Sequence, residues 1–220
     1  MGTLALIHTV HAVIPEFEAL CGRLLPGTRT AHFLDETTLR DAMAQGGLNA
    51  DIVQRVCDLV VLAARGGADA ALVTCSSIGP AAEVAQRLVA IPVRRVDGPM
   101  AAFAARRGGR IGVAATVATT LAPTVDLIRR EARRRGKHPR IVRALLADAF
   151  EARIAGDLAR HDEILREGLA RLANGVDTIV LAQATMARVA RGIRLPSRVL
   201  LLSSPESGVR QMRRLLTPRG

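Results

Sequence analysis

The sequence contains no tryptophan or tyrosine and only four phenylalanines among its 220 residues. Without aromatic side chains on which bases could stack, we do not expect a platform for single-stranded nucleic acid. No apolar run reaches the roughly 18 residues of a membrane-spanning helix, so we expect no membrane partner. The three cysteines, Cys21, Cys57 and Cys75, are an odd number at wide spacing. The first residues lack the basic region and cleavage site of a signal peptide, so we expect none. These absences predict a reduced, cytoplasmic protein.

Lysine is nearly absent too, because Lys137 is the only one and the other 30 of the 31 basic residues are arginine. The formal net charge of +11 would by itself attract polyanions through counterion release. The densest basic run, Arg129–Arg140, however, closes a predicted helix, where cations complement the helix dipole. We therefore interpret the charge as a solvated surface with no nucleic-acid partner, and keep polyanion binding as the less favoured alternative.

Motifs for bound cofactors are also missing. Neither the dinucleotide pattern G-x-G-x-x-G nor the phosphate-loop pattern G-x-x-x-x-G-K-[ST] occurs. His8 and His11 stand close together, but no further ligands follow at the spacing of a metal site. The sequence thus predicts no metal and no nucleotide or other cofactor.

Apolar runs alternate with longer helical stretches, which is the pattern of a parallel sheet with helices on both faces. We predict an α/β fold, with helices most clearly at residues 49–65, 119–135 and 157–173. Two of these helices end in glycine, and we expect left-handed caps at Gly66-Gly67 and Asn174-Gly175. The predicted strands lie at residues 4–10, 30–35, 68–74, 92–97, 110–116, 139–145, 176–182 and 198–203.

The chain contains an internal repeat. The segment "GGADAALVTCSS", residues 66–77, aligns with "NGVDTIVLAQAT", residues 174–185, at an offset of 108. The first predicted strand aligns with the fifth at an offset of 107, which pairs Thr9 with Thr116. Similar offsets in chain order indicate two related α/β halves of about 100 residues. We place the first half at residues 1–97, completed by a C-terminal helix at 205–220, and the second at 98–204.

The repeat places polar residues at equivalent strand ends in the two halves. Ligands of open parallel sheets bind beyond the carboxyl ends of the strands, and Cys75 with Ser76 and Ser77 lies at such an end. Gln183 takes the place of Cys75 in the second half. If the halves face each other about a pseudo-twofold axis, these turns line one active-site cleft. The other residues that we expect to line it are Thr9, Thr116, Ala184 and Thr185.

Cys75 is the candidate catalytic residue. It precedes a predicted helix at Gly79-Pro80 whose positive end would favour the thiolate, the reactive form of cysteine. Ser76, Ser77 and the amide groups of the turn resemble an anion cradle that could hold a carboxylate. The other two cysteines lie on apolar helical stripes, so we expect both in the core.

Further candidates each have a structural alternative. Thr119 and Thr120 precede a predicted helix, where they could hold a substrate, although Thr120 is best explained as the N-cap. His8 ends the first strand and either enters the cleft or stays in the core, and the sequence does not decide between these readings. Asp97 either approaches the cleft or caps the next helix, and we expect His161 on a solvated helix face.

Four stretches, "VTCSSIGP", "VDGPM", "IGVAATVATTLAPT" and "VLAQATMARV", resemble those of the aspartate/glutamate/hydantoin racemase superfamily. The resemblance covers nearly the whole chain and implies two pseudo-symmetric α/β halves with the active site between them. It also implies a cofactor-independent reaction in which two cysteines, on opposite sides of the substrate, move a proton at the carbon next to a carboxylate. Cys75 matches the first of these cysteines.

The second cysteine has no match. Where such racemases carry Gly-Cys-Thr, this sequence has Ala182-Gln183-Ala184, and an amide does not exchange protons usefully at neutral pH. His8 stands where glutamate racemases have an aspartate before a serine, and Thr185 stands where they have a histidine. The resemblance therefore implies the fold more directly than it implies the reaction.

Three functions fit these residues. The first is a racemase, epimerase or isomerase in which Cys75 is an acid/base, with His8 or a water completing proton transfer. The second is a lyase related to arylmalonate decarboxylases, which use a single cysteine that matches the second half, or a variant with a cysteine nucleophile as in maleate isomerase. The third is a carboxylate-binding protein without catalysis. The partner would be a small carboxylate or a hydantoin-like imide, and the resemblance is compatible with a homo-oligomer.

Overall fold

The computed structural model describes residues 2–190 and 192–216. The chain divides into two compact units: unit 1 comprises Met1–Pro99 and Pro205–Gly220, and unit 2 comprises Met100–Ser204. Each unit has its own parallel sheet flanked by helices, so the predicted α/β fold class is confirmed. Within the described residues, no helix combines the length and the apolar character needed to cross a membrane.

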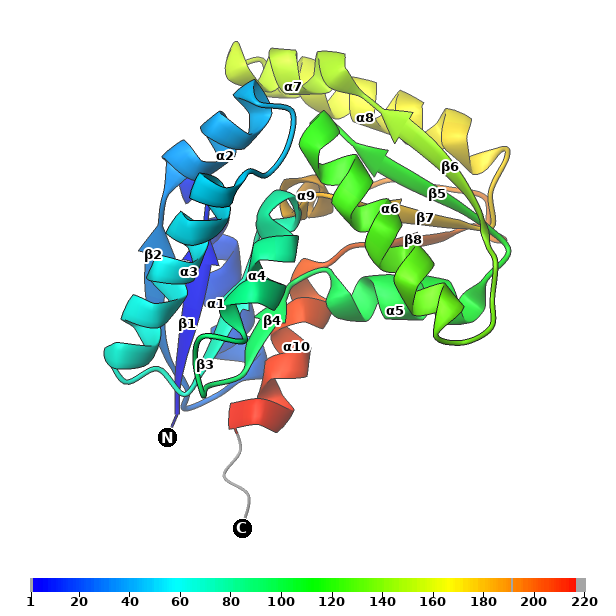
Figure 1. The fold of residues 1–220 in the computed structure, drawn as a ribbon. Helices are drawn as coiled ribbons and strands as arrows, with labels where there is room; N and C mark the ends of the chain where they lie inside the picture. The colour runs from blue at the N-terminus through cyan, green and yellow to red at the C-terminus, as the bar shows by residue number, and fades with distance from the viewer. Residues whose placement is uncertain (1, 191, 217–220) are drawn as a thin grey trace. The chain divides into compact units, whose positions relative to one another are not determined.

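Unit 1 contains a four-stranded parallel sheet with the order β2-β1-β3-β4 (Figure 1). Its central strands β1 and β3 are mostly buried apolar runs, as expected for strands covered on both faces. The strands are β1 (Thr3–His8), β2 (Arg29–Leu34), β3 (Ala70–Val73) and β4 (Val93–Arg95). The helices are the 3-10 turns η1 (His11–Val13) and η2 (Ser76–Ile78), and α1 (Ile14–Leu24), α2 (Glu36–Ala44), α3 (Ala50–Arg65), α4 (Gly79–Ala85) and α10 (Pro205–Leu216).

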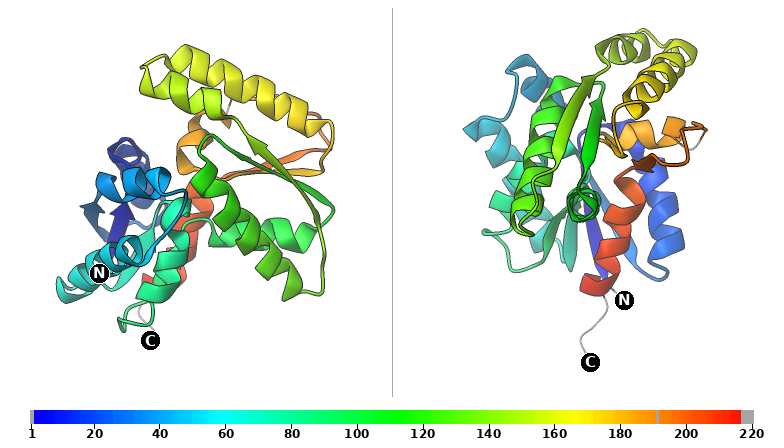
Figure 2. Two further views of the ribbon diagram at one scale, coloured as in Figure 1. Left: turned by 45° about the horizontal axis from the view of Figure 1, so that its top comes forward. Right: turned by 90° about the vertical axis from the view of Figure 1, so that its right-hand side faces the viewer.

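Helices cover both faces of the sheet of unit 1. On one face, α3 and α4 pack against Ile7 and Val73, and α3 contributes an apolar stripe with Ile52, Val56 and Val60. On the other face, α1 lies beside α10, as the blue and red helices of Figure 2 show. Because α10 also packs against β3, residues that follow unit 2 in the chain complete unit 1.

Unit 2 repeats this architecture with the strand order β6-β5-β7-β8. Its core has two parts, because α5 and α6 cover one face of the sheet and α7, α8 and α9 cover the other (Figure 1). The strands are β5 (Arg110–Ala115), β6 (Arg140–Leu145), β7 (Thr178–Leu181) and β8 (Leu200–Leu202). The helices are the 3-10 turn η3 (Ala184–Met186), and α5 (Gly98–Arg107), α6 (Ala118–Arg133), α7 (Ala147–Ile154), α8 (Leu158–Ala173) and α9 (Ala187–Ala190).

Each unit contains an equivalent hydrogen bond at the start of its first strand, in addition to the same strand order. In unit 1, the Asp69 carboxylate accepts a hydrogen bond from the N–H of Thr3, the first residue of β1, at 2.7 Å. In unit 2, the Asp177 carboxylate accepts one from the N–H of Arg110, the first residue of β5, at 2.9 Å. The sequence pairs Asp69 with Asp177 at the same offset of 108, so the repeat reproduces local geometry and not only residue types.

The predicted elements agree with the structure except at two details. Each of the eight strands overlaps its predicted range, and α3, α6 and α8 begin within one residue of the predicted helices. Gly67 has the expected left-handed backbone (φ 86°), but Asn174 is right-handed and Gly175 is not among the glycines with positive φ. The prediction that His161 is solvated is also wrong, because its ring is buried and Nδ1 donates to the Ala149 carbonyl at 2.7 Å.

Candidate active site

Cys75 lies in the turn between β3 and α4 of unit 1. β3 ends at Val73, and Cys75 keeps an extended backbone (φ −114°, ψ 124°) before the 3-10 turn Ser76–Ile78. α4 then begins at Gly79, as predicted, with Pro80 in its first turn. The thiol is therefore presented at the carboxyl end of the sheet, although α4 has only seven residues and contributes a weaker dipole than a long helix.

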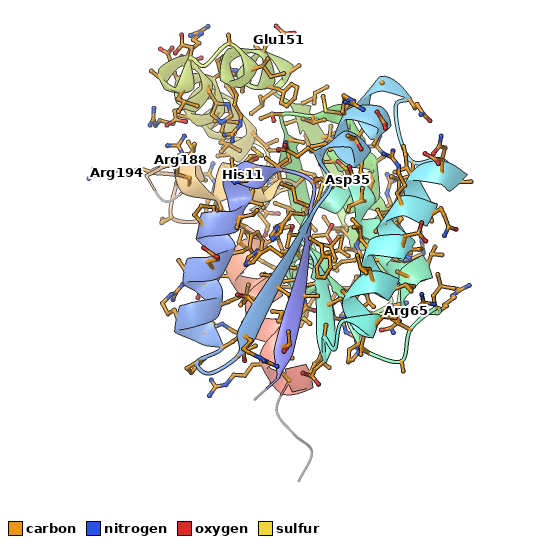
Figure 3. The ribbon with its side chains drawn as sticks, turned by 90° about the vertical axis from the view of Figure 1, so that its left-hand side faces the viewer. His11, Asp35, Arg65, Glu151, Arg188 and Arg194 are labelled. Carbon is orange, nitrogen blue, oxygen red and sulfur yellow. The ribbon has the colours of Figure 1, made fainter. Side chains whose placement is uncertain are left out.

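Polar groups collect at this end of unit 1. Figure 3 shows His11 and Asp35, which follow β1 and β2, at the carboxyl end of the strands, and Arg65 at the opposite end. Asp35 caps α2 there by accepting hydrogen bonds from the N–H groups of Thr37 and Thr38 at 2.9 and 3.2 Å. This is the end at which open parallel sheets bind their ligands.

Cys75 differs from the other two cysteines in its exposure. Cys75 is partly exposed at the edge of the core, whereas Cys21 and Cys57 are buried on α1 and α3, as predicted. Burial raises the pKa of Cys21 to about 11, and burial together with the charge of Asp58 raises the pKa of Cys57. Both thiols therefore stay protonated at neutral pH, which leaves Cys75 as the accessible thiol.

Two hydroxyl groups at the strand ends around Cys75 are buried without a partner. Thr9 follows β1 and Ser76 follows Cys75, and each of these residues is only 3% exposed. Neither Oγ atom forms a hydrogen bond with any described residue. Because an unsatisfied buried hydroxyl costs about 1–3 kcal/mol, such atoms are typical of places where a ligand or water completes the hydrogen bonding. Ser77 is buried in the same turn.

His8 lies on the other face of the sheet from Cys75. Its ring is fully buried against Phe17 of α1, with ring centroids 5.7 Å apart. Its Nδ1 lies 2.8 Å from the Thr74 hydroxyl, and its Nε2 lies 3.0 Å from Nδ1 of His32. Thr74 and Cys75 are consecutive residues of an extended chain and point to opposite faces, and Cys75 packs on the side of α3 and α4. Of the two readings of His8, the structure favours the core.

The surroundings of His8 keep its ring neutral. Burial, and after it the neighbouring His32, lower the pKa of His8 to about 4. Both ring nitrogens are occupied by hydrogen bonds inside unit 1, so neither is left to reach a substrate. His32, the partner of His8, has a polar neighbour of its own: its Nε2 lies 3.6 Å from the Glu18 carboxylate. The structure thus places the His8 ring in the opposite face of the sheet from Cys75, which favours water over His8 as the group that completes proton transfer.

The equivalent turn of unit 2 has the same backbone and a different side chain. Gln183 is extended (φ −127°, ψ 135°), follows β7 by two residues and precedes the 3-10 turn Ala184–Met186, as Cys75 precedes its own turn. Its Oε1 accepts hydrogen bonds from the N–H and the hydroxyl of Thr116 at 2.5 and 3.0 Å, and from the Val117 N–H at 3.3 Å. The structure thus brings together Gln183 and Thr116, two residues that the sequence assigned to the site.

A sequence model of the Asp/Glu/Hydantoin racemase family matches residues 6–212, which is nearly the whole chain. The chain belongs to the Asp/Glu/hydantoin racemase family. A search of curated proteins found no match. The superfamily resemblance in the sequence is thereby confirmed, and it covers both units.

Solved structures of racemases share the fold of this racemase-family protein. Glutamate racemase isoform RacE1 from Bacillus anthracis is 19% identical, with a TM-score of 0.78 over 100% of this chain and 83% of that one. Allantoin racemase from Klebsiella pneumoniae is 17% identical, with a TM-score of 0.68 over 98% and 87%. A mutant of arylmalonate decarboxylase, in its sulfate-associated form, is 16% identical, with a TM-score of 0.59 over 99% and 94%. At these identities the likeness establishes the fold, and the reaction has to be argued from the site.

A buried ion pair, which sequence reasoning missed, fixes the start of α4 in this racemase-family protein. Arg95, the last residue of β4, donates from Nε and Nη2 to the two carboxylate oxygens of Asp97, each at 2.9 Å, and from Nη1 to Glu83 of α4 at 2.9 Å. Burial alone would lower the pKa of the Arg95 guanidinium, but the two carboxylates raise it. Asp97 is fully buried, and both its oxygens accept hydrogen bonds from Arg95.

Gly79 makes room for the Arg95 side chain. A Cβ at position 79 would lie 2.6 Å from Cζ and Nε of Arg95, closer than carbon atoms approach such groups. Since two carboxylates hold the guanidinium, it cannot easily swing away. Gly79 and Arg95 therefore position the start of α4, which directly follows the turn with Ser76 and Ser77. The signal in the sequence was the spacing Arg95-Val96-Asp97 at the end of a predicted strand.

The remaining candidate residues lie in unit 2. Thr120 is not the N-cap of α6, which is Val117; its hydroxyl donates to the Val117 carbonyl at 2.6 Å instead. Thr119 and Ala184 are each 8% exposed, and Thr185 is partly exposed. Among residues 2–190 and 192–216, no three His, Cys, Asp or Glu side chains are placed so that they could hold a metal ion.

Proposed function

We propose that this protein is a cofactor-independent enzyme of the racemase, epimerase or isomerase type, and that Cys75 is its acid/base. The observation that carries the proposal is a partly exposed thiol next to Ser76, whose hydroxyl, like that of Thr9 after the neighbouring strand β1, is buried without a partner among the described residues. The Cys75 thiolate takes the proton from the carbon next to a carboxylate, and the electron pair of the broken C–H bond passes into the carboxylate to form an enolate. A proton returned to that carbon completes the reaction.

The hydroxyls of Thr9 and Ser76, at the ends of the neighbouring strands β1 and β3, would stabilise the enolate. Thr9 and Ser76 can each donate one hydrogen bond to an oxygen of the bound carboxylate, and negative charge builds up on those oxygens as the proton leaves. A single donor of this kind contributes about 10²–10³-fold in rate. The same donors favour a small carboxylate as substrate, because each carboxylate oxygen accepts more than one hydrogen bond.

The second proton has to come from a group other than a thiol. Gln183 stands where racemases of this family carry their second cysteine, and its amide has no useful acidity at neutral pH. His8 is enclosed within unit 1 on both ring nitrogens. We therefore assign the second proton transfer to a water molecule, which would deliver the proton to the face of the enolate away from Cys75.

Decarboxylation is the second candidate, and the lone thiol favours it. Here the bond between the α carbon and one carboxylate breaks, carbon dioxide leaves, and the bonding electron pair remains as an enolate on the other carboxylate. The Cys75 thiol then protonates the α carbon, so one cysteine is sufficient. This reaction needs a substrate with two carboxyl groups on one carbon, and racemisation does not, so the two candidates can be separated by substrate.

The first test is the rate at which Cys75 is alkylated as a function of pH, with Cys75→Ser to identify any signal from the buried Cys21 and Cys57. We expect Cys75 to be alkylated much faster than Cys21 and Cys57, because it is partly exposed whereas they are buried. Deuterium exchange at the α carbon of small mono- and dicarboxylates, followed by NMR, then identifies the substrate. Cys75→Ser should lower the exchange rate by about 10²–10⁴-fold.

Two results would contradict the proposal. If Cys75 is unreactive, or if exchange persists in Cys75→Ser, then Cys75 is not the acid/base. Tight carboxylate binding without turnover, unchanged in Cys75→Ser, would identify a binding protein instead. Cys21→Ala is the matched control, because that thiol is buried on α1 and its loss should leave the exchange rate per folded molecule unchanged.

A further inference from the structure

The Gln183 side chain fills a cluster of hydrogen-bond donors at the start of α6. Three donors converge on its Oε1: the Thr116 N–H, the Thr116 hydroxyl and the Val117 N–H. Gln183 reaches them because β7 pairs with β5 in parallel, so the turns after both strands lie at the same edge of the sheet. Backbone N–H groups and a hydroxyl that converge on one oxygen are the donor set of an oxyanion site. The positive end of the 16-residue α6 adds to the attraction for negative charge.

In the equivalent turn of unit 1, no described residue accepts a hydrogen bond from the threonine hydroxyl. Thr9 is the counterpart of Thr116, and Cys75 is the counterpart of Gln183. A cysteine side chain has one heavy atom beyond Cβ, so it cannot extend a carbonyl oxygen over the neighbouring turn. The Thr9 hydroxyl is buried and forms no hydrogen bond within the described part of the chain, whereas the Thr116 hydroxyl is bonded to Gln183. The unpartnered hydroxyl in one copy of the turn indicates that the donors serve a ligand, and the glutamine substitutes for that ligand in the other copy.

We infer that the donor cluster of unit 2 is a second carboxylate site that the protein keeps closed with its own Gln183 amide. The amide oxygen stands where one oxygen of a small carboxylate, such as formate or acetate, would bind. Gln183 therefore acts as an internal ligand and limits carboxylate binding to the turn of unit 1 that carries Cys75. This limit on the substrate rests on the proposed function, whereas the existence of the carboxylate site in unit 2 does not.

The test is to remove the internal ligand and supply an external one. Gln183→Ala leaves the donors of Thr116 and Val117 without an acceptor, so we expect a lower melting temperature than that of the unchanged protein. Sodium formate, compared with sodium chloride at equal ionic strength, should raise the melting temperature of Gln183→Ala with saturation and recover at least half of the decrease. The unchanged protein should show no such saturable rise, because its site is filled.

The matched control is Gln183→Ala combined with Thr116→Val, which removes one donor and keeps the shape of the side chain. The effect of formate should fall at least fivefold in this double variant. No saturable rise in Gln183→Ala, or an equal rise in all three proteins, overturns the inference. Loss of exchange activity in Cys75→Ser tests the proposed function separately, so failure of one does not imply failure of the other.

Gln183→Glu provides a second test, in which a side chain still occupies the donor cluster and no added ligand is needed. The introduced carboxylate keeps the shape of the glutamine and brings a full negative charge to the same donors. Its pKa, measured by NMR, should lie at least one unit below the ordinary value of about 4.3 for a glutamate. A pKa at or above that value would show that the cluster does not favour an anion and would overturn the inference, even if Gln183→Ala does not fold.

Discussion

Cys75 in unit 1 and Gln183 in unit 2 occupy the same backbone position, two residues after a buried strand and one residue before a 3-10 turn. Beside each of them a threonine, Thr9 or Thr116, follows the neighbouring strand. The Thr116 hydroxyl binds Gln183, and the Thr9 hydroxyl has no partner in the described chain. The comparison teaches that the backbone N–H groups and the threonine hydroxyl supply the hydrogen-bond donors in such a turn. The side chain at the position of Cys75 or Gln183 then decides whether these donors are free to bind a ligand.

The surroundings of the two turns differ as well. Unit 1 places His8 and the Arg95 ion pair in buried positions near its turn. At the offsets of the repeat, 107 and 108, the counterparts of His8 and Gly79 in unit 2 are Ala115 and Ala187. Buried polar groups cost stability unless they are fully hydrogen-bonded. Unit 1 therefore carries hydrogen-bonded buried polar groups near its turn, whereas unit 2 has alanine at the positions equivalent to His8 and Gly79.

The largest effect on stability should come from the pH dependence of His8. In the unfolded chain His8 takes up a proton near pH 6.5, but in the folded protein its pKa is about 4. As the pH falls below 6.5, the unfolded state therefore binds more protons, and stability is lost progressively until about pH 4. The shift corresponds to about 3 kcal/mol of unfolding free energy at pH 4, because one pKa unit corresponds to about 1.4 kcal/mol.

Denaturant unfolding between pH 4 and pH 7 measures this loss. In His8→Gln the slope of stability against pH should become much flatter, whereas the same change at His138, which is exposed in unit 2, should leave it unaltered. Hydrogen exchange at pH 4.5 should show that β1 and β2 lose protection before β5 and β6. If the strands of both units lost protection equally, the pH dependence would not be a property of unit 1.

The next largest effect is expected at Gly79. Gly79→Ala places a Cβ against a guanidinium that Asp97 and Glu83 hold in place, so we expect a loss of about 1–3 kcal/mol of unfolding free energy, as for other overpacked sites. At the equivalent position of unit 2, Ala187→Gly should cost at most about 1 kcal/mol through helix propensity. If Gly79→Ala is as mild as Ala187→Gly, then Arg95 does not constrain the start of α4.

The smallest effect separates the two threonines. Thr116→Val removes a hydroxyl that donates to Gln183, and we expect a loss of about 0.5–1.5 kcal/mol of unfolding free energy. Thr9→Val removes a hydroxyl without a partner in the described residues, so it should be neutral or slightly stabilising, while it weakens binding of the substrate carboxylate. Thermal unfolding and substrate KM, measured on both variants, check these opposite outcomes.

The fold followed from the sequence because its signals are local. Apolar runs such as Ala70–Val73 predict buried strands, and "NAD" and "GG" mark the start and the end of α3. The repeat in the sequence is also sufficient to place Cys75 and Gln183 in equivalent turns. These features depend on neighbouring residues and on chain periodicity, which a single sequence displays.

The parts of the site that escaped prediction depend on contacts between distant segments. The direction of the His8 ring is set by Phe17, His32 and Thr74, which come from three different elements. The contact between Gln183 and Thr116 joins residues 67 positions apart. Nothing in the local pattern around either residue specifies its partner, because such pairings arise only when strands take their order in the sheet.

α10 gives the chain an unusual order of assembly. It packs on α1 and β3, Gln211 donates to the Arg95 carbonyl at 2.9 Å, and Gly208 lies so close to Val96 that a Cβ would come within 2.5 Å of its side chain. During synthesis on the ribosome, the whole of unit 2 has therefore been added to the chain before the last helix of unit 1 is made. A released chain truncated after residue 204 should show a protease-resistant unit 2 and a protease-sensitive unit 1. The half that is translated first should be the last to reach its native state.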